Sequence, residues 1–122
     1  VRQNNLSMAF IQYEKALRLA PTRASLWYKK GIVFLQKNLT EDAFHAFQKT
    51  LETDKTFALA YEGLGQVSLL RKDFRKAEKH FRHALILDSR LWKSYHFLGM
   101  IYNQQNRFDD SIPMYQASIK IV

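Results

Sequence analysis

The side chains with the most obvious chemical capacity are four histidines. His80 and His83 are three positions apart, so a helix would place both imidazoles on one face, where they could share a metal ion. Lys79 and Arg82 stand beside them and raise the local positive potential, and no third ligand is evident. The sequence therefore predicts neither a metal site nor any other cofactor.

Catalytic patterns are absent from the sequence. The chain has no cysteine, no glycine-rich phosphate loop, no nucleophile elbow and no spaced pair of carboxylates in a plausible cleft. Asp109 and Asp110 stand at the start of an expected helix, where the helix dipole stabilises negative charge. This structural role is enough to explain the two carboxylates. The sequence predicts a protein that is not an enzyme.

The strongest charge feature is the run from Arg71 to His83. It carries six Lys/Arg and two acids, so it contributes +4 of the net charge of +8. The first interpretation is a solvated outer helix face. The alternative is a docking surface for acidic protein, nucleic acid or anionic lipid, with salt-sensitive affinity. The aromatic residues of the run, Phe74 and Phe81, belong to the expected buried stripe and are not available for base stacking, so nucleic acid is disfavoured. This basic patch consists of Arg71, Lys72, Arg75, Lys76, Lys79 and Arg82.

Composition limits the fold class. The chain has 122 residues, 47% of them hydrophobic and 25% charged, as expected for one globular domain. Only four glycines and two prolines favour helices over a turn-rich sandwich. Without cysteine there is no disulfide framework, but the compartment is left open. No apolar run approaches the roughly 20 residues of a transmembrane segment.

Small and aromatic residues recur with one period of 34 residues, without insertion or deletion. Such self-similarity is the sequence signature of a repeat architecture. The columns are Gly31, Gly65 and Gly99; Ala9, Ala43, Ala77 and Ser111; Tyr13, Phe47, Phe81 and Tyr115; Leu17, Leu51, Leu85 and Ile119; and Trp27, Tyr61 and Tyr95.

Within each unit the apolar spacing is helical and breaks once, which predicts a pair of antiparallel helices. Glycine inside a helix costs about 1 kcal/mol relative to alanine, so its recurrence indicates a place where an aromatic must fit against the backbone. We expect a single domain over 1–122. It comprises the second helix of a partial repeat (1–23) and repeats at 24–57, 58–91 and 92–122.

The breaks between helices carry turn and capping residues. Asn4, Asn38 and Asn106 recur where a left-handed residue would end each first helix, and Lys72 holds that place less comfortably. Pro113 predicts a kink or a loosened first turn in the last helix. The expected N-caps are Thr40 and Asp73 for second helices, and Thr22, Thr56 and Ser89 for first helices.

These residues resemble the motif of the tetratricopeptide repeat family over essentially the whole chain. The match reads Tyr61, Leu64, Gly65, Ala77, Phe81, Ala84 and Leu85 in one unit, and departures such as Lys30 and Thr50 do not break it. The resemblance implies an all-α, right-handed superhelical α-solenoid of about seven helices, most simply a fragment of a longer protein.

The resemblance also implies that the first helix of each pair lines a concave groove that binds peptides. Tyr28, Phe97 and Met100 are the best ligand anchors, because aromatics and methionine are enriched at interface centres. For Leu35 and Leu69, packing between helices is an equal alternative. The predicted groove contains Tyr28, Lys29, Ile32, Leu35, Leu59, Glu62, Gln66, Leu69, Lys93, His96, Phe97, Met100 and Asn103, with Gln36, Gly63 and Gln104 beside them.

The resulting functional expectation is a non-catalytic adaptor that binds a protein or peptide partner. Members of the family that clamp chaperone C-termini use basic and amide side chains at five places, of which only Lys93 agrees here, so that specificity is not expected. Four apolar residues of the last expected helix would lack a neighbouring helix to pack against, which predicts either further repeats or self-association. These residues are Ile112, Tyr115, Ile119 and Ile121.

Overall fold

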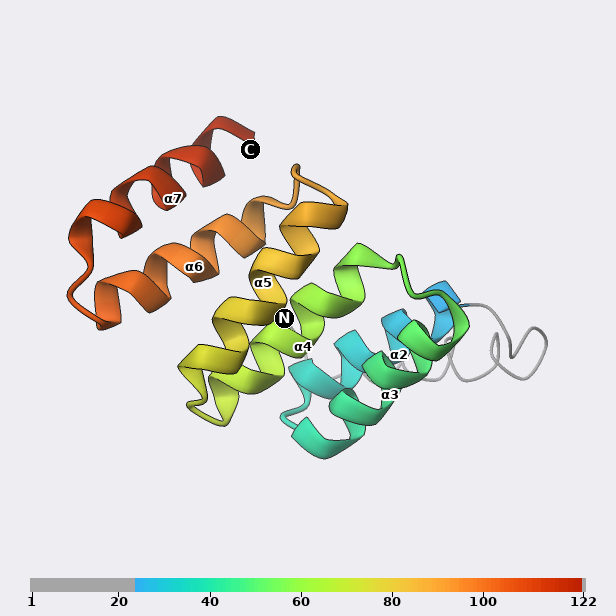
Figure 1. The fold of residues 1–122 in the computed structure, drawn as a ribbon. Helices are drawn as coiled ribbons and strands as arrows, with labels where there is room; N and C mark the ends of the chain where they lie inside the picture. Colours follow the sequence, from blue (N-terminus) through green and yellow to red (C-terminus); the bar gives the residue numbers. More distant parts are fainter. Residues whose placement is uncertain (1–23, 122) are drawn as a thin grey trace.

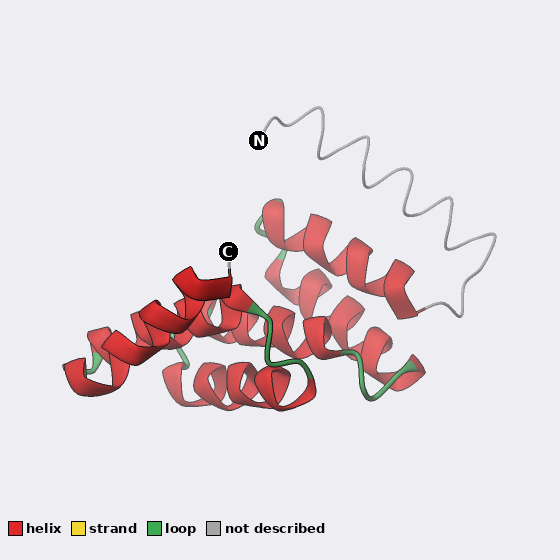
Figure 2. Cartoon of the chain, turned by 90° about the horizontal axis from the view of Figure 1, so that it is seen from above, coloured by secondary structure: helices red, strands yellow, loops and turns green. Residues whose placement is uncertain are grey.

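The computed structural model describes residues 24–121 as six α-helices joined by short loops (Figure 1). No strand occurs in this range (Figure 2). The expected helix within residues 1–23, with Asn4 and Thr22, lies outside the described residues. The helices are α2 (Ala24–Gln36), α3 (Thr40–Thr53), α4 (Ala58–Leu70), α5 (Phe74–Leu87), α6 (Trp92–Gln104) and α7 (Phe108–Ile121).

Consecutive helices pair as hairpins: α2 with α3, α4 with α5, and α6 with α7. Each second helix also packs on the first helix of the next hairpin, and α2 contacts α4. Helices α2 and α4 therefore lie side by side, and a side-chain hydrogen bond between Glu62 and Ser94 links α4 to α6. Because the described hairpins contact mainly their neighbours, the fold is a solenoid in which adjacent hairpins share a core.

Each hairpin closes through an aromatic ring seated on a glycine. A Cβ built on Gly65 would lie 2.6 Å from the Phe81 ring, and one on Gly99 would lie 2.9 Å from the Tyr115 ring. Phe47 lies against two glycines, Gly31 in its own hairpin and Gly63 in the next. The packing role predicted for the recurring glycine is confirmed, and Gly63 extends it to the contact between hairpins.

The core forms two clusters at the junctions between hairpins. One is built on Phe47, with Ala43, Leu64 and Val67; the other on Phe81, with Ala77, Leu98, Ile101 and Tyr102. Each cluster takes residues from both sides of a junction, which is how neighbouring hairpins bury the faces that neither could bury alone.

The residues that end the first helices adopt left-handed conformations, as predicted. The φ angles are 62° at Asn38, 59° at Lys72 and 61° at Asn106. Lysine tolerates this region less well than asparagine, since it lacks a short polar side chain that bonds locally. The shared geometry shows that the repeat imposes the turn even where the residue is unfavourable.

Only one of the tested N-cap predictions is confirmed. Asp73 caps α5, and its Oδ1 accepts the Lys76 N–H at 3.2 Å. Thr40 was wrong as a cap, because it is already the first residue of α3. Thr56 and Ser89 were wrong as well, since Phe57 and Leu91 occupy the N-cap positions of α4 and α6. Instead, the Thr56 hydroxyl donates to Asp54 at 2.7 Å.

Helix α7 continues through Pro113. The predicted loosening of its first turn was wrong, because the Ser111 N–H donates to the Arg107 carbonyl at 3.0 Å. Proline cannot donate to the carbonyl four residues earlier, which belongs to Asp109. Since Asp109 and Pro113 are both exposed, water can take the place of the missing donor.

Candidate functional site

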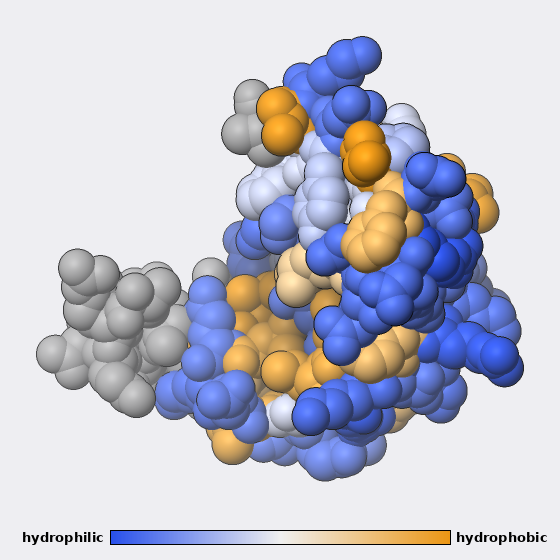
Figure 3. All heavy atoms as spheres, turned by 90° about the vertical axis from the view of Figure 1, so that its left-hand side faces the viewer, coloured by the Kyte–Doolittle hydropathy of each residue, from blue (hydrophilic) through white to orange (hydrophobic). Residues whose placement is uncertain are grey.

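One face of the stack is lined by the first helices α2, α4 and α6. On α4, Leu59, Glu62, Gln66 and Leu69 are spaced by three or four residues, so they form a single stripe. Figure 3 views the end of the molecule where these helices finish and shows a hollow with an apolar floor and largely hydrophilic margins. The predicted groove residues are distributed along this face.

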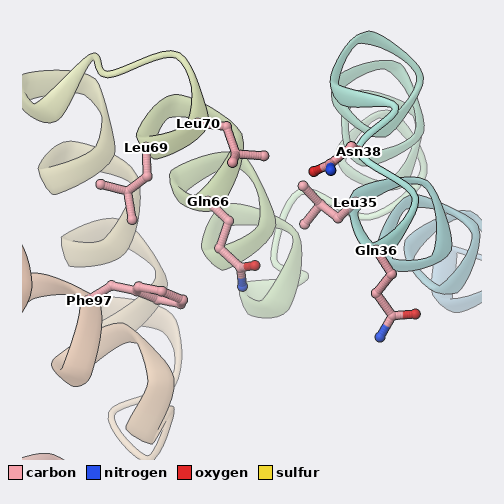
Figure 4. A pocket seen from close by; sticks show the side chains of 7 residues that line it. All are labelled: Leu35, Gln36, Asn38, Gln66, Leu69, Leu70 and Phe97. Carbon is pink, nitrogen blue, oxygen red and sulfur yellow. The ribbon is translucent and has the colours of Figure 1, made fainter. Parts of the chain in front are cut away.

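The C-terminal ends of α2 and α4 and the middle of α6 surround an apolar hollow of about 320 Å³. Leu35 and Phe97 approach α4 from its two sides (Figure 4). Leu70 is 52% exposed there, whereas Leu35 and Leu69 are half-buried. Asn38 and Leu70 were not predicted. The lining residues are Leu35, Gln36, Asn38, Gln66, Leu69, Leu70 and Phe97.

A second, smaller space of about 190 Å³ lies at the N-terminal ends of the same helices. We call it the charged recess. Four of its residues belong to the predicted groove, while three from the loop before α6 and its first turn were missed. The lining residues are Tyr28, Leu59, Glu62, Arg90, Leu91, Trp92 and Lys93.

Glu62 is the buried carboxylate of the charged recess. It is 4% exposed, and its Oε2 accepts the Ser94 hydroxyl at 2.9 Å, which joins α4 to α6. Burial raises the pKa of the Glu62 carboxyl above its usual value, although the Ser94 hydrogen bond and the Lys93 ammonium oppose this. The site therefore favours the protonated acid relative to an exposed glutamate.

Glu62→Gln is expected to stabilise the protein more at pH 7 than at pH 4. A raised native pKa means that stability is greatest below the ordinary pKa of glutamate and falls as pH rises through the raised value. Glutamine removes this loss and still offers an oxygen to Ser94. Urea unfolding at several pH values measures the difference, with exposed Glu52→Gln as control. A destabilisation by Glu62→Gln that grows with pH would contradict the assignment.

The predicted aromatic anchors also serve the core. Tyr28 packs against Phe47, with ring centroids 5.9 Å apart, and Phe97 stacks on Phe81 at 5.0 Å. Replacing either ring would therefore cost stability as well as groove surface. Met100 is 44% exposed but lines neither hollow.

The remaining predicted groove residues lie outside both hollows. Ile32 is half-buried against the Phe47 cluster. Lys29, His96 and Asn103 are exposed, and the His96 ring meets the edge of Tyr115 at 5.6 Å. These side chains therefore contribute to the margins of the face rather than to its two concave parts.

The predicted basic patch divides into two kinds of residue. Arg71 bonds to Glu41 in the preceding hairpin at 2.7 Å. Arg82 pairs with Glu78 at 3.1 Å and donates to the Tyr102 hydroxyl of the next hairpin. Both arginines are exposed, as expected for a solvated face, and they also connect hairpins. The other four residues, Lys72, Arg75, Lys76 and Lys79, are exposed as well.

On α5, His83 makes a ring contact and His80 is partly buried. The His83 ring stacks on Tyr61 with centroids 3.9 Å apart. Burial lowers the pKa of His80, and the neighbouring charges on α5 lower it further. Within residues 24–121, no group of three or more metal-ligating side chains comes together.

Comparison with known proteins identifies the repeat. Residues 2–56, 28–91 and 93–121 match the tetratricopeptide repeat. The chain is similar to the Cell division cycle protein 27 homolog of Caenorhabditis elegans, with 25% identity over 99 residues, covering 81% of this chain and 13% of the relative. It is also similar to Anaphase-promoting complex subunit 3 of Schizosaccharomyces pombe, with 22% identity over 119 residues, covering 98% of this chain and 18% of the relative.

Solved structures of MamA share the fold. One crystal structure superposes with a TM-score of 0.77 at 25% identity, covering 98% of this chain and 70% of that chain. MamA from Desulfovibrio magneticus RS-1 gives a TM-score of 0.77 at 19% identity, covering 97% and 67%. The predicted right-handed α-solenoid is confirmed. On the strength of its matching repeats, the chain belongs to the tetratricopeptide repeat family.

Proposed function

We propose that the chain is a non-catalytic interaction module that binds a segment of a partner protein along α2, α4 and α6. The observation that carries this proposal is the apolar hollow, whose wall includes the half-exposed Leu70. An exposed apolar concavity with polar margins is typical of an interaction site. One relative is by name a subunit of a complex, which supports an adaptor role.

The chain spans only 13% to 18% of the length of the curated relatives named above, so the roles of those whole proteins are not assigned to it. Among the described helices, none is long and apolar enough to cross a membrane. The apolar end face of α7 also stays a candidate for self-association, since Ile119 is 76% exposed.

Leu70→Asp is expected to weaken binding of groove-directed peptides about three- to tenfold. An aspartate at this wall would have to lose water when an apolar side chain enters the hollow. The probes are peptides selected from a displayed random library on the full 122-residue chain, and fluorescence anisotropy gives the affinities.

The matched control is Ile86→Asp, because Ile86 is 82% exposed on α5 and lies away from the hollow. Equal losses for Leu70→Asp and Ile86→Asp, or no loss for Leu70→Asp, would contradict the groove assignment. Circular dichroism should show that both variants are folded.

The second candidate function is electrostatic docking of an acidic partner on the exposed basic residues of α5 and the turn before it. Lys72, Arg75, Lys76 and Lys79 form no ion pair with any described residue. Binding of poly-glutamate that falls steeply with salt and is lost in Lys76→Glu/Lys79→Glu would favour this function. Peptide binding that is indifferent to those changes would favour the groove.

A further inference from the structure

We propose that the groove recognises an extended segment carrying one bulky apolar side chain and one acidic side chain three to five positions away. This inference rests on the proposed function and specifies the chemistry of the partner. It is carried by the apolar hollow and the charged recess, which lie on the same face but differ in their accessible groups.

The two sites lie on one stripe of each first helix. On α4, Leu59 and Glu62 line the charged recess, and Gln66 and Leu69 line the apolar hollow. On α4 the corresponding positions are seven to ten residues apart, which at 1.5 Å per residue is about 10–15 Å. An extended chain rises about 3.3 Å per residue, so three to five residues span this distance.

The apolar hollow selects an uncharged, bulky side chain. None of its seven lining residues is charged, and leucine and phenylalanine side chains make up much of its wall. A charged group entering it would lose water without gaining a partner of opposite charge. Its volume of about 320 Å³ is at the lower end of the range of ligand pockets, so it accommodates a side chain rather than a whole helix.

The charged recess presents positive charge to an approaching chain. Arg90 and Lys93 are exposed at its rim, and the Lys93 Nζ lies 5.8 Å from the Trp92 ring centroid. The opposing carboxylate, Glu62, is buried and accepts the Ser94 hydroxyl. Asp88 is exposed nearby, where its side chain accepts the Arg90 backbone N–H.

The accessible cations at the rim favour an acidic side chain over a basic one, because a basic side chain would meet like charges first, while the carboxylate of Glu62 is buried away from the approaching chain. The recess volume of about 190 Å³ is too small for a helix, which is about 10 Å across. An aspartate or glutamate within an extended segment meets both conditions.

The test is a selection of random peptides, all amidated at the C-terminus, on the full 122-residue chain. We expect enriched peptides that pair a leucine or phenylalanine with an acid three to five positions away. Changing that acid to its amide should weaken binding about two- to fivefold, the range of an exposed ion pair. Lys93→Met together with Arg90→Ala should abolish this difference, whereas Lys79→Met on the outer face of α5 should preserve it.

The outcomes separate this inference from the proposed function. Peptides that lose affinity with Leu70→Asp but carry a basic residue, or no charge preference, would overturn the inference and leave groove binding standing. An acid preference that survives Lys93→Met together with Arg90→Ala would also overturn it. Peptides unaffected by Leu70→Asp, or no enriched peptide at all, would overturn both.

Discussion

Phe81→Ala is expected to lower the free energy of unfolding by about 3–5 kcal/mol, as for other fully buried phenylalanines. Phe81 is 0% exposed, and its ring lies against Gly65 on one side and stacks on Phe97 on the other. The variant would leave a cavity where α4, α5 and α6 meet. Urea unfolding measures the loss.

Phe108→Ala is the matched control, because Phe108 begins α7 and is 52% exposed. Partial burial limits its expected cost to about 1 kcal/mol. Since each hairpin depends on its neighbours, amide exchange in Phe81→Ala should accelerate more in α4–α7 than in α2 and α3. Similar losses for the two variants would contradict the central position of Phe81.

Gly65→Ala is expected to destabilise the protein by up to about 2 kcal/mol, although alanine is the better helix former. The new methyl would lie 2.6 Å from the Phe81 ring, and overpacking of this kind costs about 1–3 kcal/mol. The helix-propensity gain of about 1 kcal/mol offsets part of that cost. Thermal and urea unfolding give the net change.

The same substitution in a Phe81→Leu background provides the control. Leucine removes the ring that meets the new methyl, so Gly65→Ala should then become neutral or stabilising, by up to about 1 kcal/mol. A cycle of the four proteins isolates this coupling. If Gly65→Ala stabilises the wild-type chain, the glycine is not required by the ring.

The sequence predicted the hairpins because their determinants are local and repeated. Gly31, Gly65 and Gly99 occupy corresponding places in successive units, and the structure brings each of them against an aromatic ring of its own hairpin. Residue type alone does not predict the backbone conformation at position 72, since Lys72 adopts the left-handed conformation that asparagine adopts at positions 38 and 106. The repeat geometry outweighs the preference of one residue.

The failed predictions concern details that depend on where a helix begins. Thr56 has the right residue type for an N-cap, but its hydroxyl bonds to Asp54 and α4 begins two residues later. Arg71 and Arg82 are exposed, as the spacing of a solvated face predicts. The sequence did not predict their contacts with Glu41 and Tyr102 on neighbouring hairpins, because no spacing within one helix indicates such contacts.

The groove was predictable only along the helices. Leu35, Gln66 and Phe97 were found from helical spacing, and all three line the apolar hollow. Leu70 is at a helix end, and Arg90 belongs to the loop between hairpins. Their place in the site depends on how adjacent hairpins are inclined, which is a property of the packing rather than of the local sequence.

The most direct test of groove binding is a ¹⁵N-edited NMR titration of the full chain with the tightest selected peptide. Groove binding should perturb amides that cluster on α2, α4, α6 and the loop carrying Arg90, and Leu70→Asp should weaken these perturbations. Perturbations concentrated on the outward faces of α5 or on α7, with the first helices unchanged, would contradict it.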